Sequence, residues 1–96
     1  MALNAGHANF TIIDVRTPEE YAAGHIPAAI NRDYKSPTFK DDIAKFDRSK
    51  IYLVYCASGG RSASARDMMI ELGFQQIYNM SGGITAWIAQ GLPLAK

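Results

Sequence analysis

The apolar run at residues 51–55 (IYLVY), with Cys56 directly behind it, restricts the possible folds of this chain more than any other segment. A run that is apolar at every position is typical of a strand covered on both faces, as in the middle of a parallel sheet. A loop of small residues follows, and residues 62–72 then place apolar side chains at helical intervals before Gly73. The segment therefore predicts a buried strand, a tight loop and a helix.

The alternation of strand and helix patterns continues on both sides of this segment. β-branched and apolar residues predict strands at three further places, residues 11–15, 28–31 and 76–80. Strands that alternate with helices favour a parallel sheet. We therefore expect one domain, residues 1–96, of the α/β class, with a small parallel β-sheet flanked by helices on both faces.

Capping signals place the first helix. Thr17 is followed by Pro18 and Glu20, which predicts a helix that begins with a capping box and ends at Gly24. Residues 41–46 (DDIAKF) predict a surface helical turn with its acids early and its lysine late.

The last helix is expected to bury one face and to end near the C-terminus. Ile84, Trp87 and Ile88 share its inner face, and the helix ends at Gly91. Trp87 is interpreted as a core residue because it lies on this inward stripe.

Composition and charge exclude several classes of protein. Ten Lys+Arg and nine Asp+Glu give a formal net charge of +1 without a block of either sign, so neither nucleic acid nor a membrane is an expected partner. The longest apolar run, residues 51–57, is too short to span a bilayer, and no secretory signal is visible, so a cytoplasmic location is expected. The single cysteine and the spacing of His7 and His25 predict neither an internal disulfide nor a metal site.

The loop after the buried strand is the candidate site. Cys56 lies at the carboxyl end of that strand, where parallel sheets collect their ligand sites. Gly59 and Gly60 allow the backbone N–H groups to converge on one point, and Arg61 adds a positive charge at the start of the next helix. These groups favour a thiolate over a thiol, which predicts a nucleophilic Cys56 with a lowered pKa. The alternative is that Cys56 is a small buried hydrophobe and Arg61 a solvated helix-start residue.

Three separated segments resemble the rhodanese family of thiosulfate and persulfide sulfurtransferases. They are residues 13–31 (IDVR, EY and GHIPAAIN), the loop CASGGRS at 56–62, and residues 80–93 with MSGG, Trp87 and GLP, in the order that the family has them. The resemblance implies a rhodanese domain whose catalytic Cys56 accepts sulfane sulfur as a persulfide, with no cofactor. The substrate-binding residues that we expect on this basis are Ala57, Ser58, Gly59, Gly60, Arg61, Ser62 and Arg16.

The resemblance further implies the reaction. A donor such as thiosulfate or a persulfide gives sulfur to Cys56, and a thiol or cyanide removes it. Four residues lie between Cys56 and Arg61, as in sulfurtransferases of this fold, whereas the phosphatases have a loop one residue longer. Ala57 stands where many thiosulfate-using relatives carry a basic residue, which leaves the donor open. The alternatives are a non-catalytic sulfur carrier or interaction module, served by a protein persulfide, and a cysteine-dependent phosphatase.

Supporting residues have two readings each. Asp14 and Arg16 lie at the end of a neighbouring strand. In one interpretation Arg16 binds an anionic donor. In the other, Asp14 and Arg16 form an ion pair that supports the loop. His25 is interpreted as part of the scaffold. Ser58 and Ser62 donate hydrogen bonds to the sulfur or cap the helix.

Two further expectations concern the end of the sheet. Gly82 and Gly83 are expected to allow a close approach beside the loop. The family usually has a further helix and strand before the segment that matches residues 12–16, and about ten residues precede that segment here. If that strand is absent, the strand at residues 76–80 is expected to have an exposed edge.

Overall fold

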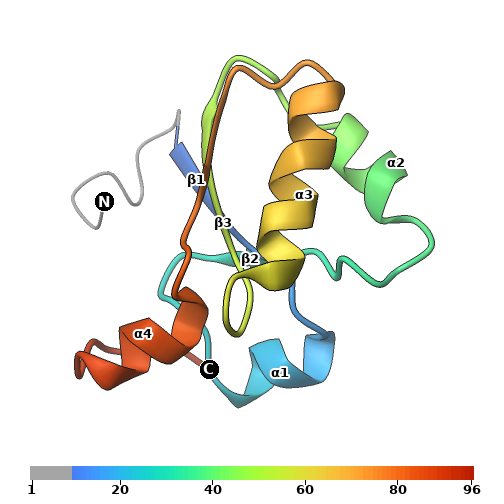
Figure 1. The fold of residues 1–96 in the computed structure, drawn as a ribbon. Helices are drawn as coiled ribbons and strands as arrows, with labels where there is room; N and C mark the ends of the chain where they lie inside the picture. Colours follow the sequence, from blue (N-terminus) through green and yellow to red (C-terminus); the bar gives the residue numbers. More distant parts are fainter. Residues whose placement is uncertain (1–9) are drawn as a thin grey trace.

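The computed structural model describes residues 10–96, in which four strands and four helices alternate along the chain (Figure 1). The elements are β1 (Phe10–Asp14), α1 (Pro18–Ala23), β2 (Ile30–Asn31), α2 (Phe39–Ala44), β3 (Ile51–Tyr55), α3 (Gly60–Glu71), β4 (Gln76–Asn79) and α4 (Gly83–Ala89). The strand predicted at 51–55 is β3 with the same bounds. The other predicted elements are present, with ends shifted by up to two residues. Both α2 and α3 begin two residues before the predicted start.

All four strands are parallel, in the order β2-β1-β3-β4. β3 lies inside the sheet, as its continuous apolar run predicts. Its register with β1 pairs Asp14 with Tyr55, so both strands end at the same level, and Cys56 follows at that end. The α/β fold class is confirmed.

Side chains that alternate along the strands build a core on each face of the sheet. Val54 and Cys56 point to the face that α2 and α3 cover, together with Ile43 and Met69 from these helices. Leu53 and Tyr55 point to the opposite face, where Ile84 of α4 packs. This alternation with period two places Cys56 and its neighbour Tyr55 on different sides of the sheet.

The predicted capping box at the start of α1 is present. The Glu20 backbone N–H donates to Thr17 Oγ1, and the Thr17 backbone N–H donates to Glu20 Oε1 at 3.0 Å. Pro18 occupies the first turn, and Gly24 ends the helix. The orientation of α1 matters for the site, because Glu20 also contacts the candidate loop.

The prediction for Ile88 is wrong. Ile84 is buried and Trp87 is half-buried against the core, but Ile88 is 53% exposed. The C-terminal part of α4 extends past the end of the sheet (Figure 1), so the last residue of the apolar stripe has no strand beneath it.

β4 is one of the two edge strands of the sheet within residues 10–96, and β2 is the other. β4 pairs with β3 alone in this part of the chain, and its Tyr78 is 55% exposed. The exposed edge expected at this strand depends on residues 1–9, which lie outside the described residues, and stays a prediction.

Within residues 10–96 we find no helix with the length and apolar character that crossing a membrane requires.

Candidate active site

Cys56 is buried at the carboxyl end of β3, with its sulfur surrounded by donors. The backbone N–H of Gly59 donates to Sγ at 3.0 Å and that of Ser62 at 3.4 Å. The Ser62 hydroxyl lies 3.5 Å from the same sulfur. The loop therefore curls around the sulfur and directs N–H and O–H groups toward it.

These donors change the acidity of the thiol. Burial raises the pKa of Cys56, but the Ser62 hydroxyl and the amides of Ser62, Gly59 and Ser58 together lower it by more. The pKa of Cys56 therefore lies below the ordinary value of a thiol. Hydrogen bonds that favour the charged form make the thiolate accessible nearer to neutral pH.

Gly59 makes the tight bend of the loop possible. Its φ of +108° lies in the left-handed region, and a Cβ there would lie 2.2 Å from the carbonyl oxygen of Ser81. The position therefore accepts no side chain, because backbone rather than a flexible side chain occupies the space. The bend brings the Gly59 N–H onto the sulfur.

The start of α4 fixes the other side of the loop. The N–H groups of Ile84 and Thr85 donate to the carbonyl oxygens of Cys56 and Ala57, at 2.9 and 3.1 Å. A Cβ on Gly83 would lie 2.5 Å from both carbonyl oxygens, which confirms the close approach expected there. The two carbonyls of the loop thus have their hydrogen-bond donors in α4.

Arg61 is paired with a residue that the sequence does not mark as part of the site. Its Nη1 and Nη2 donate to the two carboxylate oxygens of Glu20, at 3.0 and 3.3 Å. The Arg61 hydrogen bond, followed by the one from the Thr17 backbone, lowers the pKa of Glu20 to about 2. The positive charge that we expected beside the sulfur is thus largely balanced by Glu20. The sequence marks Glu20 as a capping residue and as part of the family resemblance, but not as a partner of the loop.

Asp14 supports the strand end that carries the cysteine. It is fully buried, and its carboxylate accepts hydrogen bonds from the Arg16 guanidinium, the shortest at 2.7 Å, and from the Tyr55 hydroxyl at 2.8 Å. The Tyr55 hydroxyl accepts the Ile26 N–H. The network thereby holds the residue directly before Cys56.

Arg16 takes part in that network rather than in the loop. Its Nη2 also donates to the Gly24 carbonyl oxygen at 2.7 Å, and the residue is 6% exposed. No hydrogen bond joins Arg16 to the loop in the described part of the chain. These contacts match the ion-pair reading of Arg16, and its role in binding a donor stays a prediction.

The remaining loop residues line its open side. Ser58 and Gly60 are exposed, and Ala57 and Arg61 are half-buried. Arg61 is thus the one cation of this set, and its guanidinium hydrogen bonds go to Glu20.

Asn79 is a second residue that the sequence does not mark. It is the last residue of β4, and its Oδ1 lies 2.5 Å from the Ser62 hydroxyl oxygen. Parallel pairing of β3 and β4 brings it there, because Asn79 is in register with Val54, two residues before Cys56. A polar residue at the carboxyl end of a strand was the only signal for it in the sequence.

His25 has structural contacts. Its ring stacks on that of Tyr21 with centroids 3.8 Å apart, its Nδ1 lies 2.9 Å from the Tyr21 carbonyl oxygen, and its backbone pairs with Ala95. His7 lies outside the described residues. No group of three potential metal ligands is found within residues 10–96.

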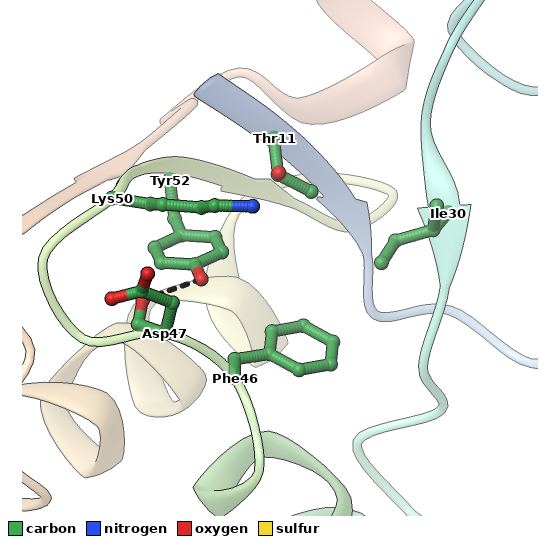
Figure 2. A pocket seen from close by; sticks show the side chains of 6 residues that line it. All are labelled: Thr11, Ile30, Phe46, Asp47, Lys50 and Tyr52. Carbon is green, nitrogen blue, oxygen red and sulfur yellow. Dashed lines mark hydrogen bonds between the residues drawn. The ribbon is translucent and has the colours of Figure 1, made fainter. Parts of the chain in front are cut away.

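A cavity of about 230 Å³ lies at the opposite end of the sheet (Figure 2). It is lined by Thr11, Ile30, Phe46, Asp47, Lys50 and Tyr52. The Tyr52 hydroxyl donates to the Asp47 carbonyl oxygen beside it. None of the predicted site residues lines this cavity. The cavity is therefore separate from the candidate site at the Cys56 loop.

Known proteins are similar to this chain in both fold and sequence. Residues 2–90 match the family model of the rhodanese-like domain. Thiosulfate sulfurtransferase 16 of Arabidopsis thaliana is 39% identical, over 95% of this chain and 82% of the relative. Thiosulfate:glutathione sulfurtransferase of Saccharomyces cerevisiae is 34% identical, over 86% of this chain and 68% of the relative. A rhodanese-related protein from Thermoplasma volcanium has a similar structure, with a TM-score of 0.81, 36% identity, and coverage of 91% of this chain and 84% of that one.

Fold and site together define an α/β domain that holds a cysteine sulfur in a loop of amide donors at the end of a central strand. The chain belongs to the rhodanese-like domain family. Its named relatives place it among the sulfurtransferases of the rhodanese type, which confirms the resemblance found in the sequence.

Proposed function

We propose that this protein transfers sulfane sulfur through a persulfide on Cys56. The observation that carries the proposal is the set of donors on the sulfur: two backbone N–H groups and the Ser62 hydroxyl, which favour the thiolate. A thiolate is the nucleophile that sulfur transfer requires. The relatives named as thiosulfate sulfurtransferases support the same reaction class.

The reaction balances as two displacements. The Cys56 thiolate attacks the outer sulfur of the donor. A bond forms between these two sulfurs while the bond from the outer sulfur to the rest of the donor breaks, and that remainder leaves as sulfite from thiosulfate or as a thiolate from a persulfide. An acceptor thiolate or cyanide then attacks the outer sulfur, and the Cys56 thiolate leaves. The donor's leaving group and the acceptor account for all electrons, so no cofactor is needed.

The loop residues have separate roles in this proposal. The amides of Ala57, Ser58, Gly59, Gly60 and Arg61 hold the outer sulfur, which carries the negative charge of the persulfide. Converging amides stabilise such an anion without reorganisation. Asp14 acts at a distance, because it holds Tyr55 and with it the strand end. We assign Arg16 to the same support, with donor binding as the alternative.

The charges at the loop bear on the choice of donor. Glu20 already occupies the Arg61 guanidinium, and Ala57 offers no second cation. Thiosulfate, a dianion, has to compete with Glu20 for Arg61, whereas a persulfide brings at most one negative charge at its sulfur and competes less. A small persulfide or a protein persulfide is therefore a donor to compare directly with thiosulfate, with glutathione or another thiol as acceptor.

The proposal is tested by turnover. Thiosulfate or a glutathione persulfide is supplied as donor and cyanide or glutathione as acceptor, and the product is measured for the natural protein and for Cys56→Ser. We expect turnover with at least one donor and none in the variant. Full turnover in Cys56→Ser contradicts the proposal.

The same assay separates the alternatives. Slow turnover with every small donor, together with rapid sulfur uptake from a protein persulfide, identifies a sulfur carrier. Hydrolysis of an aryl phosphate identifies a phosphatase. The four-residue spacing from Cys56 to Arg61 opposes the phosphatase, because it leaves a narrower loop for a tetrahedral phosphate.

A further inference from the structure

Three acceptors compete for the single proton of the Ser62 hydroxyl. The Oγ atom lies 3.5 Å from Cys56 Sγ, 3.2 Å from the Gly59 carbonyl oxygen and within hydrogen-bond distance of Asn79 Oδ1. A hydroxyl has one proton and two lone pairs, so it can donate to only one of the three at a time. When the proton points to Asn79, the sulfur loses its side-chain donor.

The amide of Asn79 can reverse this assignment. A half-turn of the amide brings Nδ2 rather than Oδ1 toward Ser62, and Nδ2 is a donor. The Ser62 oxygen then accepts from Asn79, and its own proton is free for the sulfur. No other hydrogen bond of the Asn79 side chain is found within residues 10–96, so the half-turn breaks no further contact there.

We propose that Asn79 is a positioning residue. Through its contact with the Ser62 hydroxyl, it controls whether that hydroxyl donates a hydrogen bond to the Cys56 sulfur. With Nδ2 toward Ser62, the chain of donors runs from Asn79 to Ser62 to the thiolate. Each hydrogen bond in such a chain polarises the next, which strengthens the donation to the charged sulfur.

The two amide orientations suit the two stages of the reaction, a point that rests on the proposed function. The free thiolate carries its charge on Sγ and needs the Ser62 proton. In the persulfide the charge lies on the outer sulfur, about 2.05 Å further out along the S–S bond. The Ser62 hydroxyl can then donate its hydrogen bond to Asn79 Oδ1 again, while the loop amides hold the outer sulfur.

The test uses Asn79→Leu, which removes the amide, and Asn79→Asp, which keeps the size but can only accept from Ser62. The reactivity of Cys56 toward iodoacetamide is measured against pH in each variant, in Ser62→Ala and in the double variants. Gln76→Leu, an exposed position of the same strand, is the control and is expected to react as the natural protein does.

The expected result is a loss of reactivity below the thiol pKa of about threefold for Asn79→Leu and about tenfold for Ser62→Ala. Asn79→Asp should lose more than Asn79→Leu, because the carboxylate holds the Ser62 proton and adds a negative charge. Above the thiol pKa the reactivity of Asn79→Leu should recover. In the Ser62→Ala background, Asn79→Leu should have no further effect, since the two residues act as one unit.

Three results overturn the proposal: unchanged reactivity in both Asn79 variants, a rise in reactivity in Asn79→Leu, or a loss of equal size with and without Ser62. Alkylation does not require sulfur transfer. A protein that fails as a sulfurtransferase can therefore still confirm or contradict the role of Asn79.

Discussion

The carboxylate of Glu20 binds the start of its own helix and, at the same time, the guanidinium of Arg61, which lies 41 residues further along the chain. One side chain thereby joins α1 to the loop that surrounds Cys56. The pair is half-exposed, with 24% of the Arg61 side chain and 37% of the Glu20 side chain accessible. Arg61 therefore lies on the partly exposed side of the loop, and its positive charge is paired with the Glu20 carboxylate.

Replacement of Glu20 by glutamine should make Arg61 available to an anionic donor. Glutamine can still complete the capping box, so α1 should keep its start. We expect the KM for thiosulfate to fall severalfold, with a smaller change for a persulfide, whose sulfur end carries at most one negative charge. Steady-state kinetics with both donors measures this.

Asp67→Asn is the matched control, because it removes an exposed ion pair with Arg66 in the same helix as Arg61. It should leave both KM values as they are. An unchanged KM for thiosulfate in Glu20→Gln shows that Arg61 does not act on the donor.

Acid should weaken the fold partly through Glu20. Its pKa is about 2 in the folded protein and has an ordinary value of 4.5. A depressed folded pKa adds stability above the ordinary value, and that stability is lost as the pH falls from 4.5 toward 2. Urea unfolding at several pH values in this window should show a weaker pH dependence for Glu20→Gln than for the natural protein. Identical pH dependence in the two proteins contradicts the assignment.

Two adjacent glycines should respond very differently to alanine. Gly59→Ala places a Cβ 2.2 Å from the Ser81 carbonyl oxygen at a φ of +108°, and we expect a loss of about 2 to 3 kcal/mol with a raised thiol pKa. Gly60 has no atom within 4 Å of its Cβ position, so Gly60→Ala should change the stability by less than about 1 kcal/mol. Chemical denaturation compares the two. Equal losses contradict the described loop geometry.

Arg16→Gln distinguishes the two readings of Arg16. Arg16 is the partner of the buried Asp14 carboxylate. Its replacement leaves the Asp14 charge buried without a partner, which should lower the free energy of unfolding by about 3 kcal/mol or more. At a temperature where the variant is folded, its KM for thiosulfate should match that of the natural protein. A raised KM with unchanged stability assigns Arg16 to donor binding instead.

Local patterns in the sequence were sufficient for most of the fold. The apolar run of β3 and the capping box of α1 depend on neighbours in the chain, and both are present as expected. The stripe of α4 identified its inner face correctly at Ile84. It could not show that the sheet ends before Ile88, because periodicity gives a direction and not the extent of the surface beneath it.

The same limit explains what sequence reasoning missed at the site. Cys56 and its loop lie in one short segment with a recognisable spacing. Glu20 and Asn79 reach that loop from α1 and β4, and their contacts with Arg61 and Ser62 depend on how these elements pack. A capping glutamate and a strand-end asparagine both have ordinary local roles. The sequence around Glu20 and Asn79 therefore does not predict their contacts with the loop.

The mass of the intact protein after exposure to a sulfur donor tests the central claim most directly. After thiosulfate or a glutathione persulfide, we predict a gain of one sulfur atom, located on Cys56 by peptide mapping and removed by cyanide. No gain with either donor, or the same gain in Cys56→Ser, contradicts the claim that Cys56 carries the sulfur.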